Sequence, residues 1–493
     1  MTLQENVRYI LSPLIRFRRE THRCIGYRLD DFFHTTDNLT LLHPREVIFL
    51  MLFDGSRTIK EIDRNYSTLF LPQGKTTDVQ KYFDTLQQRF NLADELVVDS
   101  NSLDACTIAE INNRYDPNEF LIDVKDINMD FGNLRLDSPL SVNFNICTRC
   151  GFACQYCYHP LPAVNEYISL DRLKDIFKEM HDIHIESVLF TGGDPMLRPD
   201  IDEVMIEAAK AGLFFTLSTK SILSDDRIRR LHDEAGLDRF LLSIDSFSAQ
   251  TVHDLIGAPL DYVDRFRHMI GTMQALEMDA RLKSVFTSVN GDEIDDYLQN
   301  LVELNTRYAQ IVAYGRSEYR HHDGLFASKR QRDHANQAIE DFKKLHPEIT
   351  LTGGRMEPTY DEPVVVQDIE DQSERFKKRV SCNAGRFQME LVPTGEVFIC
   401  EHLPYQKEFV LGDLRKESIM ECWNSDRMKA WLSPPPREVF AEGVPCRACP
   451  EPDYQLCHTK FSRCLRYSRE IFQTVNAPDI HCPHATFKKR RTT

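Results

Sequence analysis

The sequence predicts an α/β protein built around a partial (β/α)6, TIM-like barrel, with a winged-helix domain before it and a cysteine-rich domain after it. Strand-like and helix-like segments alternate over residues 138–316, a rhythm typical of a parallel sheet flanked by helices. Short strand-like segments followed by helices fill residues 1–100. Eight of the 14 cysteines lie beyond residue 381.

Composition limits the classes of protein that fit. At 493 residues the chain has room for about three domains. Its formal net charge of −16 disfavours binding to nucleic acid. No apolar stretch of about 18 residues predicts a membrane span, and Met1–Tyr9 lacks a signal pattern. We therefore expect a cytoplasmic protein whose cysteines serve metal or redox chemistry.

The first domain is predicted from short segments separated by turns. Its expected strands are Val7–Ser12, Ile15–Arg18, Ile25–Leu29 and Asp94–Val98, and its expected helices are Arg45–Phe53, Thr58–Tyr66 and Thr77–Phe90. Residues 101–137 are polar and mixed, and we expect a linker there.

The barrel follows from apolar, β-rich runs that alternate with amphipathic segments. Its expected strands are Leu140–Ile146, Ser187–Thr191, Phe214–Ser218, Phe240–Ile244, Arg281–Thr287 and Gln310–Tyr314. Its expected helices are one capped by Ser169, then Asp200–Ala211, Asp225–Ala235 and Tyr262–Leu276. Residues 317–380 are charged and less regular, and predict a bridging region before the domain at 381–493.

The most specific motif is Cys150-x3-Cys154-x2-Cys157, directly after the first barrel strand. Three thiolates on one loop can converge on one centre. Zinc sites use four protein ligands, whereas three ligands suit an iron–sulfur cubane with one open iron. A zinc site completed by Cys147 or His159 is the alternative.

This spacing, with Tyr156 before the last cysteine, resembles the radical S-adenosylmethionine (SAM) superfamily over residues 140–315. Thr191–Pro195 resembles the GGE-type motif of that family, with Asp194 where glutamate is usual. Strand ends carry further polar residues, and active sites of barrels lie at that end. The cofactor-binding residues that the resemblance implies are Tyr156, Gly192, Gly193, Asp194, Ser218, Ser243 and Asp245.

The resemblance implies that Cys150, Cys154 and Cys157 hold a 4Fe–4S cluster. Its open iron would bind SAM, and one electron from a donor such as flavodoxin or ferredoxin would release a 5′-deoxyadenosyl radical. That radical would abstract a hydrogen atom from the substrate.

The last quarter resembles the SPASM extension of these enzymes, which carries two auxiliary iron–sulfur clusters. The resemblance implies one cluster on Cys446, Cys449, Cys457 and Cys482, and another on Cys382, Cys400 and Cys464. The segment Phe376–Ser381 offers no further cysteine, so the second cluster is predicted to have a non-cysteine ligand or an open iron. A pair of zinc ribbons is the alternative.

Glu401 directly follows Cys400. In some relatives an acid at this place deprotonates a substrate radical, so we predict that Glu401 is the base. A solvated loop acid is the alternative.

The first domain resembles the leader-peptide recognition element of enzymes that mature ribosomally made peptides. Leu11–Pro13, Leu52–Gly55 and Thr58–Ile62 carry this resemblance. It implies a winged helix to which a leader peptide adds as a strand. A DNA-reading domain is disfavoured by balanced charge, and a purely structural cap is the alternative.

Together these features predict a radical SAM/SPASM enzyme that cross-links a precursor peptide through a thioether, carbon–carbon or carbon–oxygen bond. The alternatives are maturase-like oxidation of a protein cysteine or serine, peptide epimerisation, and a zinc-bearing winged-helix regulator without enzymatic activity.

Overall fold

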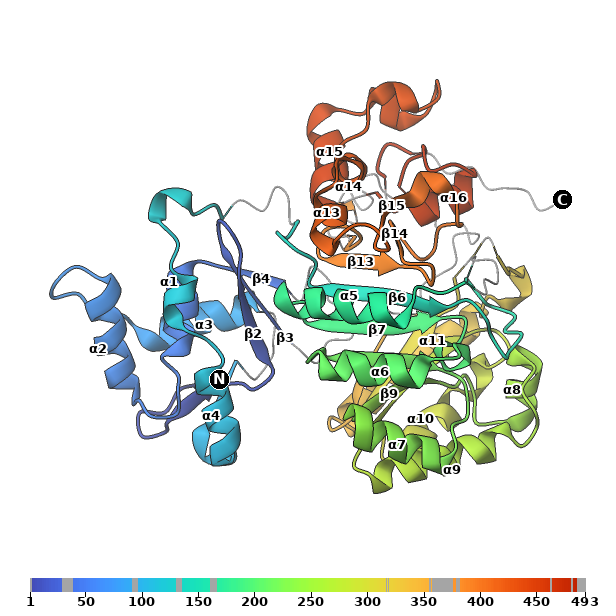
Figure 1. Cartoon of the computed structure of the whole chain (residues 1–493), viewed down its shortest axis with the longest axis horizontal. Helices are drawn as coiled ribbons and strands as arrows, with labels where there is room; N and C mark the ends of the chain where they lie inside the picture. Colours follow the sequence, from blue (N-terminus) through green and yellow to red (C-terminus); the bar gives the residue numbers. More distant parts are fainter. Residues whose placement is uncertain are drawn as a thin grey trace. The chain divides into compact units, whose positions relative to one another are not determined.

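The computed structural model describes residues 2–28, 39–90, 96–129, 135–159, 166–315, 317, 319–353, 356, 376–377, 382–461, 463–479 and 482–485. The chain divides into two compact units (Figure 1). The first comprises residues 1–137 with the short segments Val380–Asn383 and Thr459–Phe461, and the second comprises the rest.

The first unit contains two small antiparallel sheets. The strands β2 (Ile15–Arg19), β3 (Cys24–Arg28) and β4 (Leu39–Leu42) form one sheet, and β1 (Tyr9–Leu11) pairs with β5 (Val97–Asp99) in the other. Its helices are α1 (Pro44–Met51), α2 (Ile59–Phe70), α3 (Val79–Arg89) and α4 (Ala105–Asn113). Strand β4 was not expected, and Leu29 and Asp94 of the expected strands lie outside the described residues.

The predicted linker 101–137 differs from expectation, because its first part is folded into this unit. It forms α4, and the side chains of Ile111 and Phe120 are buried in the same apolar cluster as Phe17. The Tyr115 hydroxyl accepts a hydrogen bond from the backbone N–H of Phe17 at 2.9 Å. Polar composition concealed these few apolar anchors, which are spaced to meet one core.

The second unit is organised around one sheet of ten strands, in the order β12-β11-β10-β9-β8-β7-β6-β13-β14-β15. Strands β6 to β12 are parallel to their neighbours and make a partial, TIM-like barrel (Figure 1). They are β6 (Ser141–Cys147), β7 (Ser187–Gly192), β8 (Phe215–Thr219), β9 (Arg239–Ser243), β10 (Asp279–Phe286), β11 (Tyr308–Ala313) and β12 (Thr350–Thr352).

Helices follow these strands and cover one face of the sheet. They are α5 (Leu170–Asp182), α6 (Ile201–Lys210), α7 (Asp225–Ala235), α8 (Ala249–Ile256), α9 (Tyr262–Ala275), α10 (Ile294–Glu303) and α11 (Lys329–Leu345). Phe177 of α5 packs on Phe190 of β7, which also meets Phe144 of β6. These aromatic side chains therefore mark the outer face, and the residues between them point inward.

The inner face is partly accessible. On β10, Lys283 and Val285 are half-buried, while their neighbours Leu282, Ser284 and Phe286 are buried. Strands β7 and β11 show the same alternation. A closed barrel would bury both faces, so this pattern indicates an interior that is open to a ligand.

The expectation of an irregular region from residue 317 is wrong for its first part. The 17-residue helix α11 begins with a capping box between Ser328 and Gln331, and β12 joins the sheet after it. The charged outer face of α11 concealed its helical character. All six predicted barrel strands are present, with ends shifted by at most two residues, whereas α8 was not expected.

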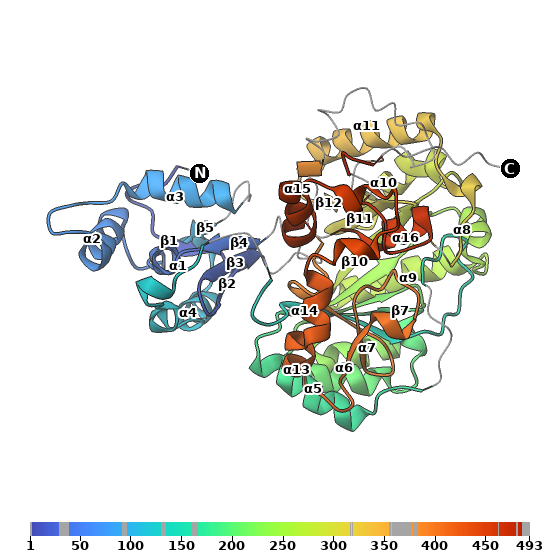
Figure 2. The same cartoon turned by 90° about the horizontal axis from the view of Figure 1, so that it is seen from above.

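The C-terminal region continues the barrel sheet. Strand β13 (Gln388–Leu391) pairs in parallel with β6, and β14 (Glu396–Phe398) and β15 (Val410–Asp413) extend it as an antiparallel meander. Short helices follow: α13 (Ile419–Asn424), α14 (Asp426–Leu432), α15 (Glu451–Gln455) and α16 (Leu465–Phe472), as Figure 2 shows. Within the described residues, none of the helices combines the length and apolar character that a membrane span requires.

Candidate functional site

The loop that carries Cys150, Cys154 and Cys157 leaves the carboxyl end of β6 and is held by backbone hydrogen bonds. The N–H of Ala153 donates to the Ile256 carbonyl at 2.9 Å, and that of Gln155 donates to the Leu255 carbonyl at 3.0 Å. The last turn of α8 thus fixes the middle of the loop. Cys154 is buried, Cys157 is half-buried and Cys150 is exposed.

The far side of this loop is held by residues that follow β11. The Arg320 guanidinium donates to the carbonyl of Cys154 at 3.0 Å, and the Ser317 hydroxyl donates to the carbonyl of Cys157 at 3.2 Å. Both were assigned to the bridging region, but they hold the cysteine loop.

Gly192 and Gly193 allow the end of β7 to approach this loop. A Cβ atom on Gly192, whose φ is +133°, would lie 2.1 Å from the Cys147 carbonyl oxygen. A Cβ on Gly193 would lie 2.3 Å from that of Arg149. No side chain fits at such distances, so glycine is needed at both positions. The two glycines pack against the cysteine loop, and the Gly193 N–H donates to the Cys147 carbonyl at 2.6 Å.

Asp194 is 1% exposed and its carboxylate accepts five hydrogen bonds from the chain. Oδ1 accepts from the Met196 N–H and the Thr219 hydroxyl, and Oδ2 accepts from the N–H groups of Lys220 and Ser221 and from the Ser221 hydroxyl. A carboxylate offers about four lone-pair sites. Asp194 therefore ties the end of β7 to the end of β8 and has no acceptor capacity left.

Asp245, just after β9, contacts one other expected residue, Tyr156, and one that was not expected, Lys220. Its Oδ2 accepts from the Tyr156 hydroxyl and, at 3.1 Å, from the Lys220 ammonium. Burial alone would lower the pKa of Lys220, but Asp245 and Cys154 raise it above its usual range. A fixed positive charge thus lies beside the cysteine loop. Ser218 on β8 and Ser243 at the end of β9 lie at the same sheet edge.

The thiols of this loop influence one another, which shows that they lie close together. Burial raises the pKa of Cys154 to about 11, with Cys150 and Cys157 also raising it and Lys220 opposing them. Iron–sulfur ligation needs thiolates, so binding would release these protons. The buried Asn145 Oδ1, next to Gly192, has no hydrogen-bond partner among the described residues. The soft donor set and the glycine contact surface fit a cluster with a cofactor beside it.

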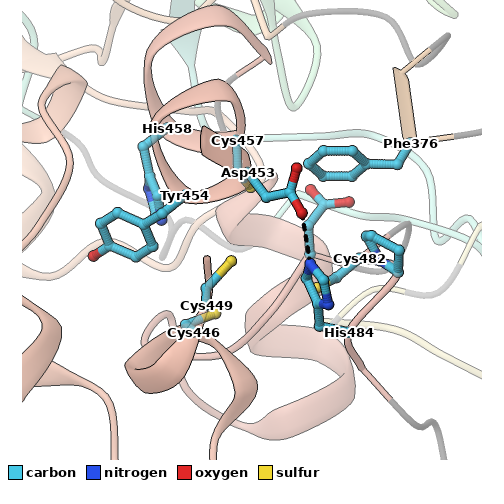
Figure 3. Close-up of a pocket in the computed structure, with 11 residues that line it drawn as sticks. Phe376, Cys446, Cys449, Asp453, Tyr454, Cys457, His458, Cys482 and His484 are labelled. Atoms are coloured by element: carbon cyan, nitrogen blue, oxygen red, sulfur yellow. Dashed lines mark hydrogen bonds and ion pairs between the residues drawn. The ribbon is translucent and has the colours of Figure 1, made fainter. Parts of the chain in front are cut away.

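A second group of cysteines lines one cavity of the C-terminal region, whose empty volume is about 320 Å³. Figure 3 shows its members around the same space: Cys446, Cys449, Cys457 and Cys482, with Asp453, His458 and His484. Burial raises the pKa of Cys446 and Cys449 to about 11 and that of Cys482 to about 12. The four cysteines predicted to share one cluster thus lie together.

The third predicted set comes from both units. Cys400 follows β14 and Cys464 is the N-cap of α16, and both are half-buried in the second unit. Cys382 lies in Val380–Asn383, which belongs to the first unit. Residues 378–381 lie outside the described residues. A cluster shared by these three cysteines stays a prediction.

Within the described residues, no three His, Cys, Asp or Glu side chains converge closely enough to hold a single metal ion. A zinc centre needs such convergence at about 2 Å from the metal. A cubane spreads its ligands over several iron atoms, so a wider cysteine set is compatible with it.

Glu401 lies in a polar group inside the second unit. Its carboxylate is 3.5 Å from the Tyr158 hydroxyl and 3.4 Å from Nε2 of His402. Burial raises the pKa of Glu401, while Lys283 and Arg466 oppose that rise. Burial also holds the pKa of His402 well below its usual range. The Glu401 side chain is 22% exposed, so it is a partly buried carboxyl rather than a fully solvated loop acid.

Sequence reasoning missed Tyr158 and Lys220 as members of the site. Tyr158 follows Cys157 as Glu401 follows Cys400, so two residues next to predicted ligands meet in space. Its position directly after a predicted cluster ligand was the sequence feature that could have identified Tyr158 as a site residue. No pattern in the sequence indicated that the Lys220 ammonium would pair with the Asp245 carboxylate, because the two residues follow different strands, β8 and β9.

Comparison with known proteins gives two domain matches. Residues 144–304 match the radical SAM superfamily, and residues 382–450 match SPASM, an iron–sulfur cluster-binding domain.

Among similar proteins, a PqqA peptide cyclase of Methylocella silvestris is 23% identical over 363 residues, covering 71% of this chain and 88% of the relative. One from Rhizobium meliloti is 23% identical, covering 73% and 90%. The crystal structure of Streptococcus suis SuiB bound to its precursor peptide SuiA aligns with a TM-score of 0.59 at 15% identity, covering 96% of this chain and 99% of that one.

The partial barrel, the cysteine loop at its mouth and these two matches define the class of protein: a radical SAM enzyme. The chain is more specifically a radical SAM enzyme with a SPASM domain, which uses SAM and 4Fe–4S iron–sulfur clusters.

Proposed function

We propose that this enzyme modifies a ribosomally made precursor peptide, most directly by forming a cross-link within it. The observation that carries the proposal is the shared sheet: β13 of the SPASM region pairs with β6 of the barrel. Auxiliary clusters would therefore border the interior in which hydrogen abstraction takes place. Similarity to PqqA peptide cyclases and to SuiB supports a peptide as substrate.

Cys150, Cys154 and Cys157 would hold the radical-forming cluster, and Gly192, Gly193, Ser218, Ser243 and Asp245 would border SAM. When bound, these cofactors supply a 5′-deoxyadenosyl radical. The chain's own residues fix the cysteine loop, place the Lys220 charge beside it and enclose the reaction. Asp194 would act through the turn that it ties, because its oxygens are already satisfied.

Two auxiliary clusters would accept the electron that remains after bond formation. Cys446, Cys449, Cys457 and Cys482 would hold one, and the cavity that they share supports this assignment. Cys382, Cys400 and Cys464 would hold the other, with a non-cysteine ligand or an open iron.

Glu401 would remove a proton from the substrate during this oxidation. Its carboxylate borders the interior beside the cysteine loop, within reach of Tyr158. Placement next to Cys400 would put proton and electron acceptors together.

The first unit would be a winged-helix domain that binds the leader of the precursor peptide by strand addition. On β2 the outward groups are already occupied, because Tyr115 accepts from Phe17 and Arg114 donates to the Ile15 carbonyl at 3.4 Å. On β4 the Leu41 carbonyl accepts from the Arg89 side chain at the end of α3. A leader strand could replace that side chain, so β4 is the edge that we favour.

The other candidate functions have less support. A zinc-bearing regulator is not favoured, because residues 144–304 match the radical SAM superfamily. Maturase-like oxidation would not call for a leader-binding unit, and epimerisation needs a hydrogen-atom donor rather than two electron-accepting clusters. Flavodoxin or ferredoxin would supply the electron.

The test is co-expression of the full chain with small peptides encoded beside its gene, followed by mass spectrometry. Loss of two hydrogens from a peptide, with 5′-deoxyadenosine formed in vitro, is the expected result. An unchanged mass with inverted residues would indicate epimerisation. A colourless protein that forms no 5′-deoxyadenosine would contradict the proposal.

A further inference from the structure

Glu390 is a buried acid on the inner face of the sheet that none of the roles above uses. It lies on β13, directly opposite Asn143 of β6, and is 8% exposed. The Asn143 and Gln388 amides donate to the same oxygen, Oε1, at 3.2 and 3.0 Å. No donor to its other oxygen is found within the described residues.

The direction of this side chain follows from the packing of its neighbours. Phe144, next to Asn143 on β6, points to the outer layer with Phe190 and Phe177. Residues alternate between faces along a strand, so Asn143 and its partner Glu390 point into the barrel. Electrostatic interaction of Glu390 with Glu401 places both acids in the same interior.

The cationic side chains described in this interior act on Glu401 and leave Glu390 without a cationic partner. Lys283 of β10 and Arg466 of α16 both act on Glu401, and Arg466 also pairs with Glu470 at 2.7 Å. Glu390 forms no ion pair with a described residue, and burial and Glu401 raise its pKa. Burial therefore favours the neutral, protonated acid, and a cation from outside the chain would stabilise its charged form.

We propose that Glu390, oriented by Asn143 and Gln388, binds a basic side chain, lysine or arginine, of the peptide segment that enters the barrel. This inference rests on the proposed function, which supplies the peptide. Glu390 is then a specificity residue: its Oε1 is held by the two amides, and its other oxygen faces the substrate ammonium or guanidinium. The site lies beside Glu401 and would position the neighbouring substrate residue for reaction.

A structural role would need hydrogen-bond acceptors but no charge. Glu390→Gln keeps the shape and one acceptor oxygen for the two amides, and it removes the charge. We expect this variant to fold, since it replaces a carboxylate that lacks a cationic partner. Glu203→Gln, on a half-exposed acid of α6, is the matched control.

The first test measures binding of Nα-acetyl-L-lysinamide and its neutral norleucine analogue to the reconstituted full chain with SAM, by saturation-transfer NMR. The wild type and Glu203→Gln should prefer the lysine compound by about tenfold. Glu390→Gln should bind both compounds equally. Equal binding by the wild type, or an undiminished preference in Glu390→Gln, would overturn the inference.

The second test uses the peptide that the wild type modifies. Glu390→Gln should raise its KM by about tenfold, while kcat and peptide-independent 5′-deoxyadenosine formation stay within about twofold. Replacing the basic residues of the peptide by norleucine should raise KM in the wild type and not in Glu390→Gln. A kcat loss without a KM change would contradict substrate binding. If no peptide is modified, the proposed function fails, and the lysinamide measurement still decides the role of Glu390.

Discussion

The loop that carries Cys150, Cys154 and Cys157 is joined by its backbone to three neighbouring segments, whereas the backbone around Cys446 and Cys449 is held by arginines and short turns of its own segment. The first loop bonds to the end of α8, to the turn after β7 and to the side chains of Ser317 and Arg320. Arg437 donates to the carbonyls of Cys446 and Cys449 at 3.3 and 2.8 Å.

The two regions also differ in the apolar cores on which they rest. The first loop rests on the main apolar core, which includes Cys154 and Tyr156. The second has a separate cluster whose buried members are Phe440, Cys446 and Tyr454. So small an apolar cluster contributes little stability by itself. We infer that the first loop is shaped by the protein fold, and that the second depends on its bound cluster for order.

The largest expected effect is loss of the radical-forming centre. Cys154→Ala should reduce 5′-deoxyadenosine formation by at least about 100-fold, because a ligand matters more than the partners that orient it. The fold should remain, since backbone bonds hold the loop. Chromatographic assay of 5′-deoxyadenosine and circular dichroism measure both. Cys106→Ala, on an exposed cysteine of the first unit, should retain full activity, and an active Cys154→Ala variant would contradict the assignment.

Removal of the clusters tests the comparison directly. Bound metal contributes on the order of 10 kcal/mol to small sites of this kind, so chelation should disorder residues 436–458 while leaving the barrel intact. Limited proteolysis with mass spectrometry should then show new cuts in 436–458 and none in β6 to α8. Simultaneous cutting in both regions would mean that the barrel also depends on its cluster.

Asp194 separates a structural role from cofactor binding. Asp194→Ala leaves five donors without their acceptor and should lower the free energy of unfolding by about 3 kcal/mol or more. Urea unfolding measures this, with Asp226→Ala on α7 as the exposed control. If Asp194→Ala weakens SAM binding without loss of stability, Asp194 contacts the cofactor instead of supporting the turn.

The barrel could be predicted because its strands are short apolar runs ended by glycines and polar residues, a local pattern. Strand β12 and helix α11 escaped prediction, since a charged outer face masks the few buried positions such as Ala335 and Phe342. The anchors at 101–129 escaped for the same reason. A local sequence pattern therefore predicts a strand or helix only where its apolar positions stand out from the polar ones.

In the candidate site, the sequence could predict only the residues that belong to motifs with a recognisable spacing. The cysteine motifs named their own residues, and Gly192 and Gly193 were found with them. The sequence assigned those glycines to cofactor approach, which stays a prediction, and the structure adds that both pack against the backbone of Cys147 and Arg149. Contacts between strands that are far apart in the sequence, such as that of Glu390 with Asn143, depend on the order and register of the strands in the sheet. No sequence motif encodes these.

The smallest effect that we predict concerns Arg437, and it sharpens the contrast between the two regions. Its guanidinium also pairs with Glu451 at 2.6 Å and lies 4.1 Å from the ring centre of Tyr454. Arg437→Ala should cost about 1–2 kcal/mol locally, as two carbonyl contacts and a stacked cation are lost. Hydrogen exchange of amides in 436–458 should accelerate by about tenfold or more.

Arg437→Lys should recover little of this protection, because an ammonium cannot reproduce the planar guanidinium, which bonds both carbonyls through Nη1 and Glu451 through Nη2. Arg427→Ala is the control, since Arg427 makes a comparable single contact with the Lys407 carbonyl at 2.8 Å. The acceleration should be greatest in cluster-free protein, where Arg437 is one of the few remaining restraints beside Arg447, whose guanidinium donates to the Phe440 carbonyl at 3.0 Å. Equal protection in Arg437→Ala and wild type without clusters would show that the turns of this segment are stable by themselves, and the contrast with the Cys150–Cys157 loop would be one of degree.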